Sequence, residues 1–464
     1  MKNYGLSPEL QALGDWVICG SETDDPQEWI YLGRLAEYGR RYNVKFDTSK
    51  EKVVAIVGKR GQGKSYTLAS LIEGHITAKN PSSISSVYGN RAILMFDTLN
   101  IFQWMYIPLD RQSKLQEINK QASLLAGWGI NPEVLNVDIW VPAGYKYELT
   151  PAGYKELFLN VSSFSAEDWG VLLDLDTVRD IKGQFLSEVY QKVVNIGWRD
   201  IKGNNYEPQN NYSIQDLINC IEYDEDKEDS IFKPDTRRAI LQQLRSYAMH
   251  KIFSSSGTPL NEILKPGRAA VILLNRLPED LRGVVVATII RRIVHERAEA
   301  SENIKDLLVN PTLDGKLRAE REEFISKAIP RAWIVVDEAQ NVIPSGRKTS
   351  ATDSIIKLVK EGRNFGLSFV VTTQQPRALD VNVLSQVETF IIHKLVSQVD
   401  IDYILDNLKS PFPTEIKDDY KILTPRELIR DIEIGQAVIS DTNTKRCFVM
   451  EIRPRVSVHG GFEA

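Results

Sequence analysis

The 464-residue sequence contains little cysteine, little histidine and no long apolar run. Its three cysteines, Cys19, Cys220 and Cys447, lie far apart, which excludes a disulfide framework and favours a reducing cytoplasm. The five histidines include no H-x-x-x-H pair for zinc. Apolar runs such as Val284–Ile290 are too short to span a bilayer, and Met1–Leu13 lacks the apolar core of a secretory signal. We therefore expect a cytoplasmic protein without membrane contact.

The sequence also lacks an excess of positive charge. Its 57 Lys and Arg residues face 62 Asp and Glu residues, for a formal net charge of −5. This balance excludes a global basic footprint for nucleic acid but leaves room for a local basic channel, because binding depends on how charge is distributed. With 42% hydrophobic residues, the chain can bury one large core and a second module.

The most informative stretch that is present is Gly58–Ser65, GKRGQGKS, which fits the phosphate-loop pattern G-x-x-x-x-G-K-[ST]. A chance match is the alternative. The β-branched run Val53–Val57 before it predicts a buried strand, and Leu68, Leu71 and Ile72 after it have helical spacing. A loop between strand and helix aims backbone N–H groups at one point, where the helix dipole favours a polyphosphate. The expected nucleotide-binding residues are Gly58, Lys59, Arg60, Gly61, Gln62, Gly63, Lys64, Ser65 and Tyr66.

A second part of the expected site follows another apolar strand. Ala332–Val336 is continued by Asp337 and Glu338, which should lie at the carboxyl edge of the sheet. We expect Mg²⁺ to be held by Ser65 and Asp337, Lys64 to reach the β- and γ-phosphates of ATP, and Glu338 to polarise the attacking water. An acidic pair after a strand is common, so the pair gains meaning only beside the phosphate loop.

Two downstream polar residues are further catalytic candidates. Arg363, before the predicted strand Phe369–Thr372, is a candidate to stabilise charge on the γ-phosphate. The alternative is a surface arginine at a helix C-terminus. Gln374, after that strand, is a candidate sensor of the γ-phosphate or the water, and the alternative is a turn residue before Pro376.

Alternation of strand-like and helix-like segments predicts a parallel α/β core over residues 51–149 and 263–464. Residues 150–262 carry long amphipathic stretches, Thr177–Ile196 and Thr236–Ile252, and predict an inserted helical subdomain. Residues 1–50 predict a short β element whose two strands are separated by the acidic turn Glu22–Pro26. The charged segment Ala300–Ile329 should be an exposed helix, and Ala437–Glu451 a β-hairpin. Further core strands are expected at Ala92–Phe96, Val137–Val141, Ala270–Leu274 and Phe390–Ile392, with helices at Thr288–Arg297 and Asp353–Glu361.

Taken together and in this order, these motifs resemble the HerA branch of the FtsK–HerA ATPases. The resemblance covers roughly residue 50 to the C-terminus. The glycine loop is generic, whereas its combination with E-G-R-x-F-G-L and Q-x-P stretches is specific. The stretches that carry it are Gly58–Leu68, Leu277–Arg282, Val336–Asn341, Glu361–Leu367, Thr373–Pro376, and Arg453–Arg455 continuing to His459–Gly461.

The resemblance implies a RecA-like core with an inserted helical bundle, assembled as a homo-hexameric ring that translocates double-stranded DNA. Nucleotide would lie between subunits, with Arg363 near the γ-phosphate and the Arg453–Arg455 stretch near the subunit boundary. Asp97 matches a family acidic residue, but Leu99–Ile101 follows where relatives often have Gly-Glu. Arg347 and Lys348 are candidates to line a DNA pore, and the alternative is a solvated loop.

The family usually carries an N-terminal β-barrel of about a hundred residues, whereas only about 50 residues precede the phosphate-loop strand here. We therefore expect a truncated or absent barrel. Family members work with a NurA-type nuclease in DNA-end resection, or with other nucleases or sirtuin-like NADases in antiphage defence. Two functions stay open: an ATP-driven DNA motor, and an ATP-binding ring that serves as a platform for a partner effector. A simple nucleotide switch would leave the Arg363 and Gln374 stretches unexplained.

Overall fold

The computed structural model describes residues 16–21, 26–36, 42–77, 82–87, 89–146, 153–228, 231–410, 412–418 and 421–461. The expected acidic turn at 22–26 lies mostly outside these residues, as does the expected domain boundary at 149/150. In the part of the chain that the structure describes, no helix is both long enough and apolar enough to span a membrane.

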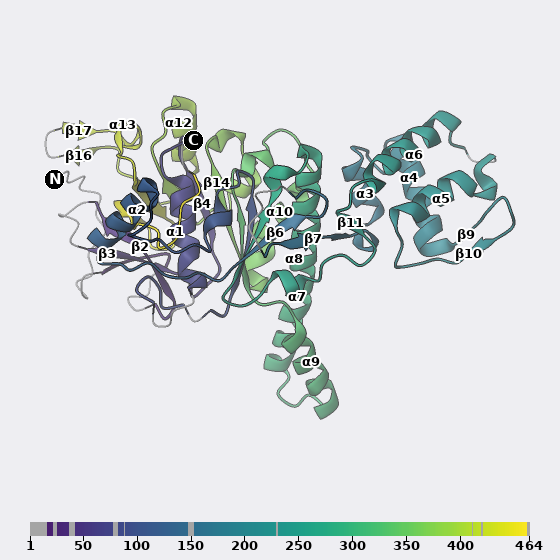
Figure 1. The fold of residues 1–464 in the computed structure, drawn as a ribbon, viewed down its shortest axis with the longest axis horizontal. Coiled ribbons are helices and arrows are strands. Elements are labelled where there is room, and N and C mark those ends of the chain that lie inside the picture. Colours follow the sequence, from purple (N-terminus) through teal and green to yellow (C-terminus); the bar gives the residue numbers. More distant parts are fainter. Residues whose placement is uncertain are drawn as a thin grey trace.

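One large sheet organises the molecule (Figure 1). Its strands among the described residues are β1 Trp16–Cys19, β2 Trp29–Leu35, β3 Asn43–Asp47, β4 Val53–Val57, β5 Ala92–Asp97, β6 Val137–Pro142, β7 Lys155–Leu157, β12 Ala269–Leu273, β13 Ala332–Val336, β14 Leu367–Thr373, β15 Thr389–Ile392, β18 Gln436–Asp441 and β19 Arg446–Ile452. Their order is β1-β3-β2-β19-β18-β15-β4-β14-β13-β5-β12-β6-β7. From β15 to β7 all neighbours are parallel. This confirms the predicted α/β class with a largely parallel core.

Both faces of the parallel sheet are covered, as its near-continuous apolar strands require. In β4, Val54 and Ile56 belong to a core cluster that also contains α1 (Lys64–Ile76) and α2 (Gln116–Gly127). The alternate residues, Ala55 and Val57, belong to the cluster on the opposite face. Side chains that alternate across a strand thus build two separate cores.

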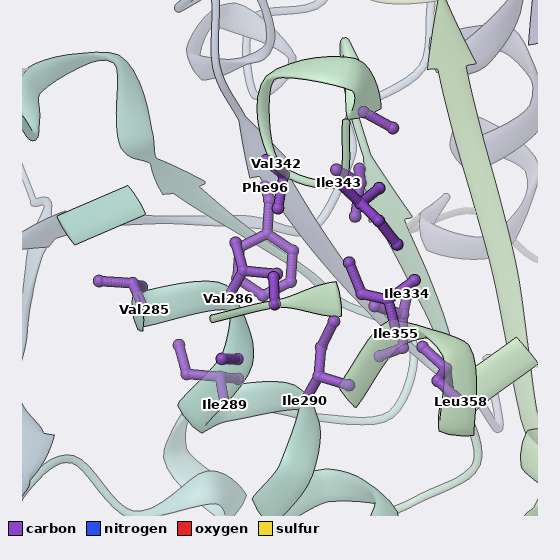
Figure 2. Packing of buried hydrophobic residues seen from close by; sticks show 14 of the residues in the cluster. Phe96, Val285, Val286, Ile289, Ile290, Ile334, Val342, Ile343, Ile355 and Leu358 are labelled. Carbon is purple, nitrogen blue, oxygen red and sulfur yellow. The ribbon is translucent and has the colours of Figure 1, made fainter. Parts of the chain in front are cut away.

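The second core is formed by α8 (Glu279–Val309) and α10 (Thr352–Glu361), which pack against β5 and β13. Figure 2 shows the contact at close range, with Phe96 of β5 and Ile334 of β13 facing both helices. The helical residues labelled there are Val285, Val286, Ile289, Ile290, Ile355 and Leu358, all buried. These contacts hold β13, and with it the acidic pair that follows, in place.

The helix predicted at 288–297 is the middle of the 31-residue helix α8. Its C-terminal part and α9 (Gly315–Lys327) project below the sheet in Figure 1. No residue of α9 is buried, as predicted for this charged segment. Ala300 and Ser301 on α8, and Ile329 after α9, are exceptions to the predicted exposure, since all three are buried.

The longer helices within residues 150–262 stand beside the sheet at one end of the molecule (Figure 1). They are α3 Ala166–Leu172, α4 Ile181–Gln191, α5 Ile214–Tyr223 and α6 Pro234–Ala248, whereas the short α7 Leu260–Ile263 lies near α8 in Figure 1. The helix predicted from Thr177 begins only at Ile181, and its last turn, Lys192–Ile196, is a π-helix. Inside this group Trp169 Nε1 donates a hydrogen bond of 2.7 Å to the Tyr212 hydroxyl. The helical insertion as a separate domain stays a prediction.

The predicted N-terminal strands are present, and they continue the large sheet. β2 pairs antiparallel with β19 and with β3, and β3 pairs parallel with β1. β18 and β19 form the predicted C-terminal hairpin. Between β15 and β18 the chain adds α12 (Gln398–Asn407), the pair β16 (Ile416–Asp418) and β17 (Lys421–Leu423), and α13 (Pro425–Asp431).

Candidate functional site

The phosphate loop joins β4 to α1, as its flanking residues predict. Gly63 is the N-cap of α1 with φ of 103°, a backbone conformation that glycine adopts without strain. The loop is tied to both neighbouring strands: Gly58 N–H donates to the Thr373 carbonyl at 3.3 Å, and Lys59 N–H to the Lys394 carbonyl at 2.9 Å. These two hydrogen bonds therefore fix the backbone conformation at the start of the loop.

Strand order brings the other predicted residues to this loop. β14 lies between β4 and β13, and all three strands are parallel. Their carboxyl ends therefore share one edge of the sheet, where ligands of open α/β folds bind. The residues that follow the three strands are the phosphate loop, Gln374 and the pair Asp337–Glu338.

Glu338 is the centre of this group. Its side chain is only 3% exposed, and the Lys64 ammonium nitrogen lies 3.6 Å from Oε1. Gln374 Nε2 donates to Oε1 at 2.6 Å, and Gln340 Nε2 donates to Oε2 at 2.8 Å. The backbone at Glu338 has φ of +47°, a left-handed conformation that costs free energy in a residue with a side chain. Such strain, where neighbouring contacts enforce it, is typical of functional sites.

Asp337 is fully buried, and its two carboxylate oxygens differ. Thr372 donates from Oγ1 to Oδ1 at 2.6 Å, whereas Oδ2 has no hydrogen-bond partner. Burial, followed by the nearby Asp97 carboxyl, raises the pKa of Asp337 to about 7. A buried carboxylate oxygen without a partner is what a hard cation would satisfy, and Mg²⁺ commonly takes one or two carboxylates together with substrate phosphates. Asp337 thus fits a ligand of Mg²⁺, whereas Ser65 as the second ligand stays a prediction.

Lys64 begins α1 and is almost fully buried. Burial lowers the pKa of its ammonium group, while the Glu338 and Asp337 carboxylates act in the opposite direction. Its Nζ also donates to the Lys59 carbonyl at 3.4 Å. The cation is therefore held over the loop by groups that a polyphosphate could replace.

Asp97, the expected family acid, ends β5 and is fully buried. Its carboxylate accepts backbone N–H groups from Leu99, Ile101 and Phe102, at 3.1, 3.3 and 2.8 Å. Asp97 therefore stabilises the turn that follows β5. Its carboxyl group also helps to raise the pKa of Asp337.

Arg363 is not brought to this group within one chain. It precedes β14, whereas Gln374 follows it, so Arg363 lies at the opposite edge of the sheet. Seven strand residues separate the two edges by about 20 Å. The Arg363 side chain is 60% exposed and pairs with Glu388 at 3.0 Å. Within one chain this arginine is therefore remote from the phosphate loop.

Two residues in the site have no role in the sequence-based expectation. Thr372 accepts the Glu338 N–H at 2.9 Å while donating to Asp337, so it joins both acidic residues. Its hydroxyl at the end of an apolar strand, beside the predicted site, was the available signal. Gln340, two residues after Glu338, gave no comparable signal, because its contact depends on the turn that the left-handed backbone creates.

The remaining candidates lie as follows. Arg347 and Lys348 are exposed in the loop after β13, on the same edge as the phosphate loop, and Lys348 lies 3.2 Å from Asp353. Arg453 and Arg455, expected near a subunit boundary, are fully buried within their own chain. Both pair with Glu73 of α1, at 2.9 and 3.3 Å. They therefore anchor the C-terminal segment to the helix that carries the phosphate loop.

The fold and the glycine loop place the chain in the class of P-loop nucleotide-binding folds, with a RecA-like core. A solved structure supports the fold: VirB4 of Thermoanaerobacter pseudethanolicus is similar with a TM-score of 0.50 and 12% identity, over 93% of this chain and 98% of that one. The model of the family described as "Helicase HerA, central domain" matches residues 30–293. Because this match covers more than half of the chain, the protein belongs to the HerA family.

Curated relatives agree. The chain is 25% identical over 303 residues to the DNA double-strand break repair helicase HerA of Pyrococcus furiosus, covering 60% of this chain and 52% of that protein. It is 30% identical over 150 residues to the helicase of the same name from Sulfolobus acidocaldarius, covering 32% of this chain and 26% of that protein. The chain thus spans about half or less of the length of these relatives. The expected HerA resemblance is confirmed.

Proposed function

We propose that this chain is an ATP-hydrolysing subunit of a homo-hexameric ring that moves on double-stranded DNA. One observation carries the proposal. Lys64, Asp337, Glu338 and Gln374 meet at one edge of the sheet, whereas the exposed Arg363 lies at the other. A ring in which one subunit's loop edge faces its neighbour's Arg363 edge would complete the site.

In the proposed reaction each residue has a defined task. The loop amides from Gly58 to Tyr66 would bind the phosphates of ATP, with Lys64 on the β- and γ-phosphates. Bound Mg²⁺, on Ser65 and Asp337, would neutralise developing charge. Glu338 would orient and polarise the attacking water, and Gln374 would hold Glu338 in position. A neighbour's Arg363 would stabilise charge on the transferred phosphate, a contribution of roughly 10³–10⁵-fold in related chemistry.

DNA as the substrate is supported by the names of the relatives, which are DNA repair helicases. Arg347 and Lys348 are the proposed pore contacts, because they lie exposed on one loop at the nucleotide edge. Cys19, Cys220 and Cys447 all lie in the described residues, are buried and form no disulfide, which supports the proposed cytoplasmic location.

A second candidate is a ring that serves mainly as a platform for a partner effector, such as a NurA-type nuclease, another nuclease or a sirtuin-like NADase, including in antiphage defence. The observation that favours it is a set of exposed apolar side chains on residues 166–254, which a partner protein could cover. The most exposed are Val178 at 76%, Ile196 at 70%, Ile231 at 89% and Met249 at 84%.

An ATPase assay on the size-fractionated oligomer, with and without duplex DNA, tests the proposal. We expect hydrolysis by the wild type, stimulation by DNA, and loss of hydrolysis in Glu338→Gln. Hydrolysis that ignores DNA but is needed for a partner's activity would favour the platform. A monomeric wild type that does not hydrolyse ATP would contradict both.

A further inference from the structure

His393 lies directly beneath the phosphate loop, and the proposed reaction assigns it no task. It follows β15, whose last residue, Ile392, is paired with Val57 at the end of β4. The His393 N–H donates to the Val57 carbonyl at 2.8 Å, so the residue is fixed beside the first glycine of the loop. Its side chain is fully buried. A polar ring in such a place needs partners, and it has two.

The two ring nitrogens of His393 have different partners. Nδ1 lies 2.8 Å from the Gln436 carbonyl oxygen, and Nε2 lies 2.8 Å from the Thr67 hydroxyl. A carbonyl only accepts, so Nδ1 carries the hydrogen, and Nε2 accepts from Thr67. Burial, with the Lys64 ammonium adding to it, lowers the pKa of His393 to about 4, so the ring is neutral at physiological pH. The ring is thus held in one tautomer and one orientation.

The His393 side chain leaves little room at either end of the loop. A Cβ added to Gly58 would meet Cβ of His393 at 2.6 Å, and one added to Gly63 would meet its Cε1 at 3.5 Å. Thr67, fully buried in the first turn of α1, donates its own N–H to the Gly63 carbonyl at 2.8 Å. The bond from Thr67 to the ring therefore fixes the turn whose N–H groups face the phosphates.

We propose that His393 is a positioning residue that holds the phosphate loop and the first turn of α1 in the shape that binds nucleotide phosphates. The inference rests on the proposed nucleotide site. The ring acts through Thr67 on one side and is braced by the Gln436 carbonyl, at the start of β18, on the other. A loop ordered before binding loses less conformational entropy when the phosphates arrive, so this brace raises affinity.

Two substitutions test the hydrogen bond between Thr67 and His393, one at each residue. His393→Phe keeps a planar ring but removes both hydrogen bonds, and Thr67→Val removes only the hydroxyl. We expect each to weaken ADP binding, measured by titration calorimetry, by about tenfold, the effect of losing a buried hydrogen bond. Because both remove the bond between Thr67 and His393, the double variant should bind ADP about as weakly as His393→Phe alone.

A rescue distinguishes positioning from general damage. His393→Gln can still present an amide to the Thr67 hydroxyl, so it should bind ADP more tightly than His393→Phe. The matched control is His75→Phe. His75 is a buried histidine on α1, the helix of Thr67, and its ring nitrogens have no hydrogen-bond partner. We expect wild-type ADP affinity in that variant. All variants are compared by thermal unfolding without nucleotide, to show that each is folded.

The outcomes separate this inference from the proposed function. Wild-type ADP affinity in folded His393→Phe and Thr67→Val would overturn the inference and leave the nucleotide site intact. Additive losses in the double variant, with no rescue by Gln, would also overturn it. A wild type that binds no ADP would overturn the proposed function and this inference with it.

Discussion

Gln374 donates a hydrogen bond of 2.6 Å from Nε2 to Oε1 of Glu338, the carboxylate oxygen that also faces Lys64 at 3.6 Å. The two residues follow adjacent parallel strands, β14 and β13. The carboxylate proposed to polarise water is therefore oriented by an amide and by the loop lysine together. Binding of a polyphosphate to Lys64 would change the balance between these two contacts.

Glu338→Gln should abolish ATP hydrolysis while keeping nucleotide binding, because the amide preserves the shape but accepts no proton. A loss of about 10²–10⁴-fold in turnover is expected for a missing general base. Steady-state turnover and calorimetric ATP binding measure the two properties. Wild-type turnover in this variant would remove Glu338 from the proposed chemistry.

Gln374→Ala should lower turnover on the order of 10–100-fold, because Glu338 loses the donor that orients it. The neighbouring Gln375 is exposed, so Gln375→Ala is the matched control and should hydrolyse ATP at the wild-type rate. Equal losses in the two variants would contradict a specific role for Gln374.

Arg363→Ala should still bind ATP, whereas its turnover should collapse, since the proposed site needs this side chain from a neighbouring subunit. Arg377 is also exposed and provides the control Arg377→Ala, with wild-type turnover expected. Mixing Arg363→Ala chains with Lys64→Ala chains should restore part of the activity, because some interfaces would then combine an intact loop with an intact arginine. Mixed rings that stay inactive would contradict a contribution from the neighbour.

Acidification should destabilise the fold between about pH 6.5 and pH 4. Burial lowers the pKa of His75 and of His459 to about 3 and that of His393 to about 4, so the unfolded chain, with histidine pKa values near 6.5, binds more protons in this range. Each histidine then removes about 1.4 kcal/mol of unfolding free energy per pH unit. The raised pKa of Asp337, about 7, acts in the opposite direction and offsets one histidine. Thermal unfolding of the wild type from pH 7.5 to 5 measures the slope, and His75→Phe should reduce it by about half. An unchanged slope in that variant would contradict the assignment.

Glu73→Ala should lower the free energy of unfolding by about 3–5 kcal/mol, because it leaves two buried guanidinium groups without their carboxylate. Glu73 pairs with Arg453 and Arg455, and its Oε1 also accepts the Ser457 hydroxyl at 2.7 Å. The exposed pair of Glu323 with Lys327 supplies a control, since Glu323→Ala should leave the unfolding midpoint essentially unchanged. Denaturant unfolding compares the two variants. Equal stability would show that the buried cluster contributes nothing.

Local sequence patterns predicted much of the fold. The apolar runs that form β4 and β13 are continuous, so their strand character and their position at the centre of a parallel sheet could be inferred from the residues alone. Helix limits were less predictable: α8 runs through a polar stretch to Val309, because contacts from residues such as Ala300 compensate for its composition. The start of α4 was predicted too early. Side-chain hydrogen bonds hold the residues before Asp180 in a turn, and the apolar pattern does not show such bonds.

By itself, the sequence determined the phosphate loop, the acidic pair and the α/β class, because each depends on neighbours along the chain. Tertiary structure decided which strand ends adjoin, and so which side chains meet. The placement of β14 between β4 and β13 brings Gln374 and Thr372 to the acidic pair and puts Arg363 at the far edge. It was also tertiary structure that set His393 under the loop, through the pairing of β15 with β4. Such contacts depend on strand order, which local residue patterns do not encode.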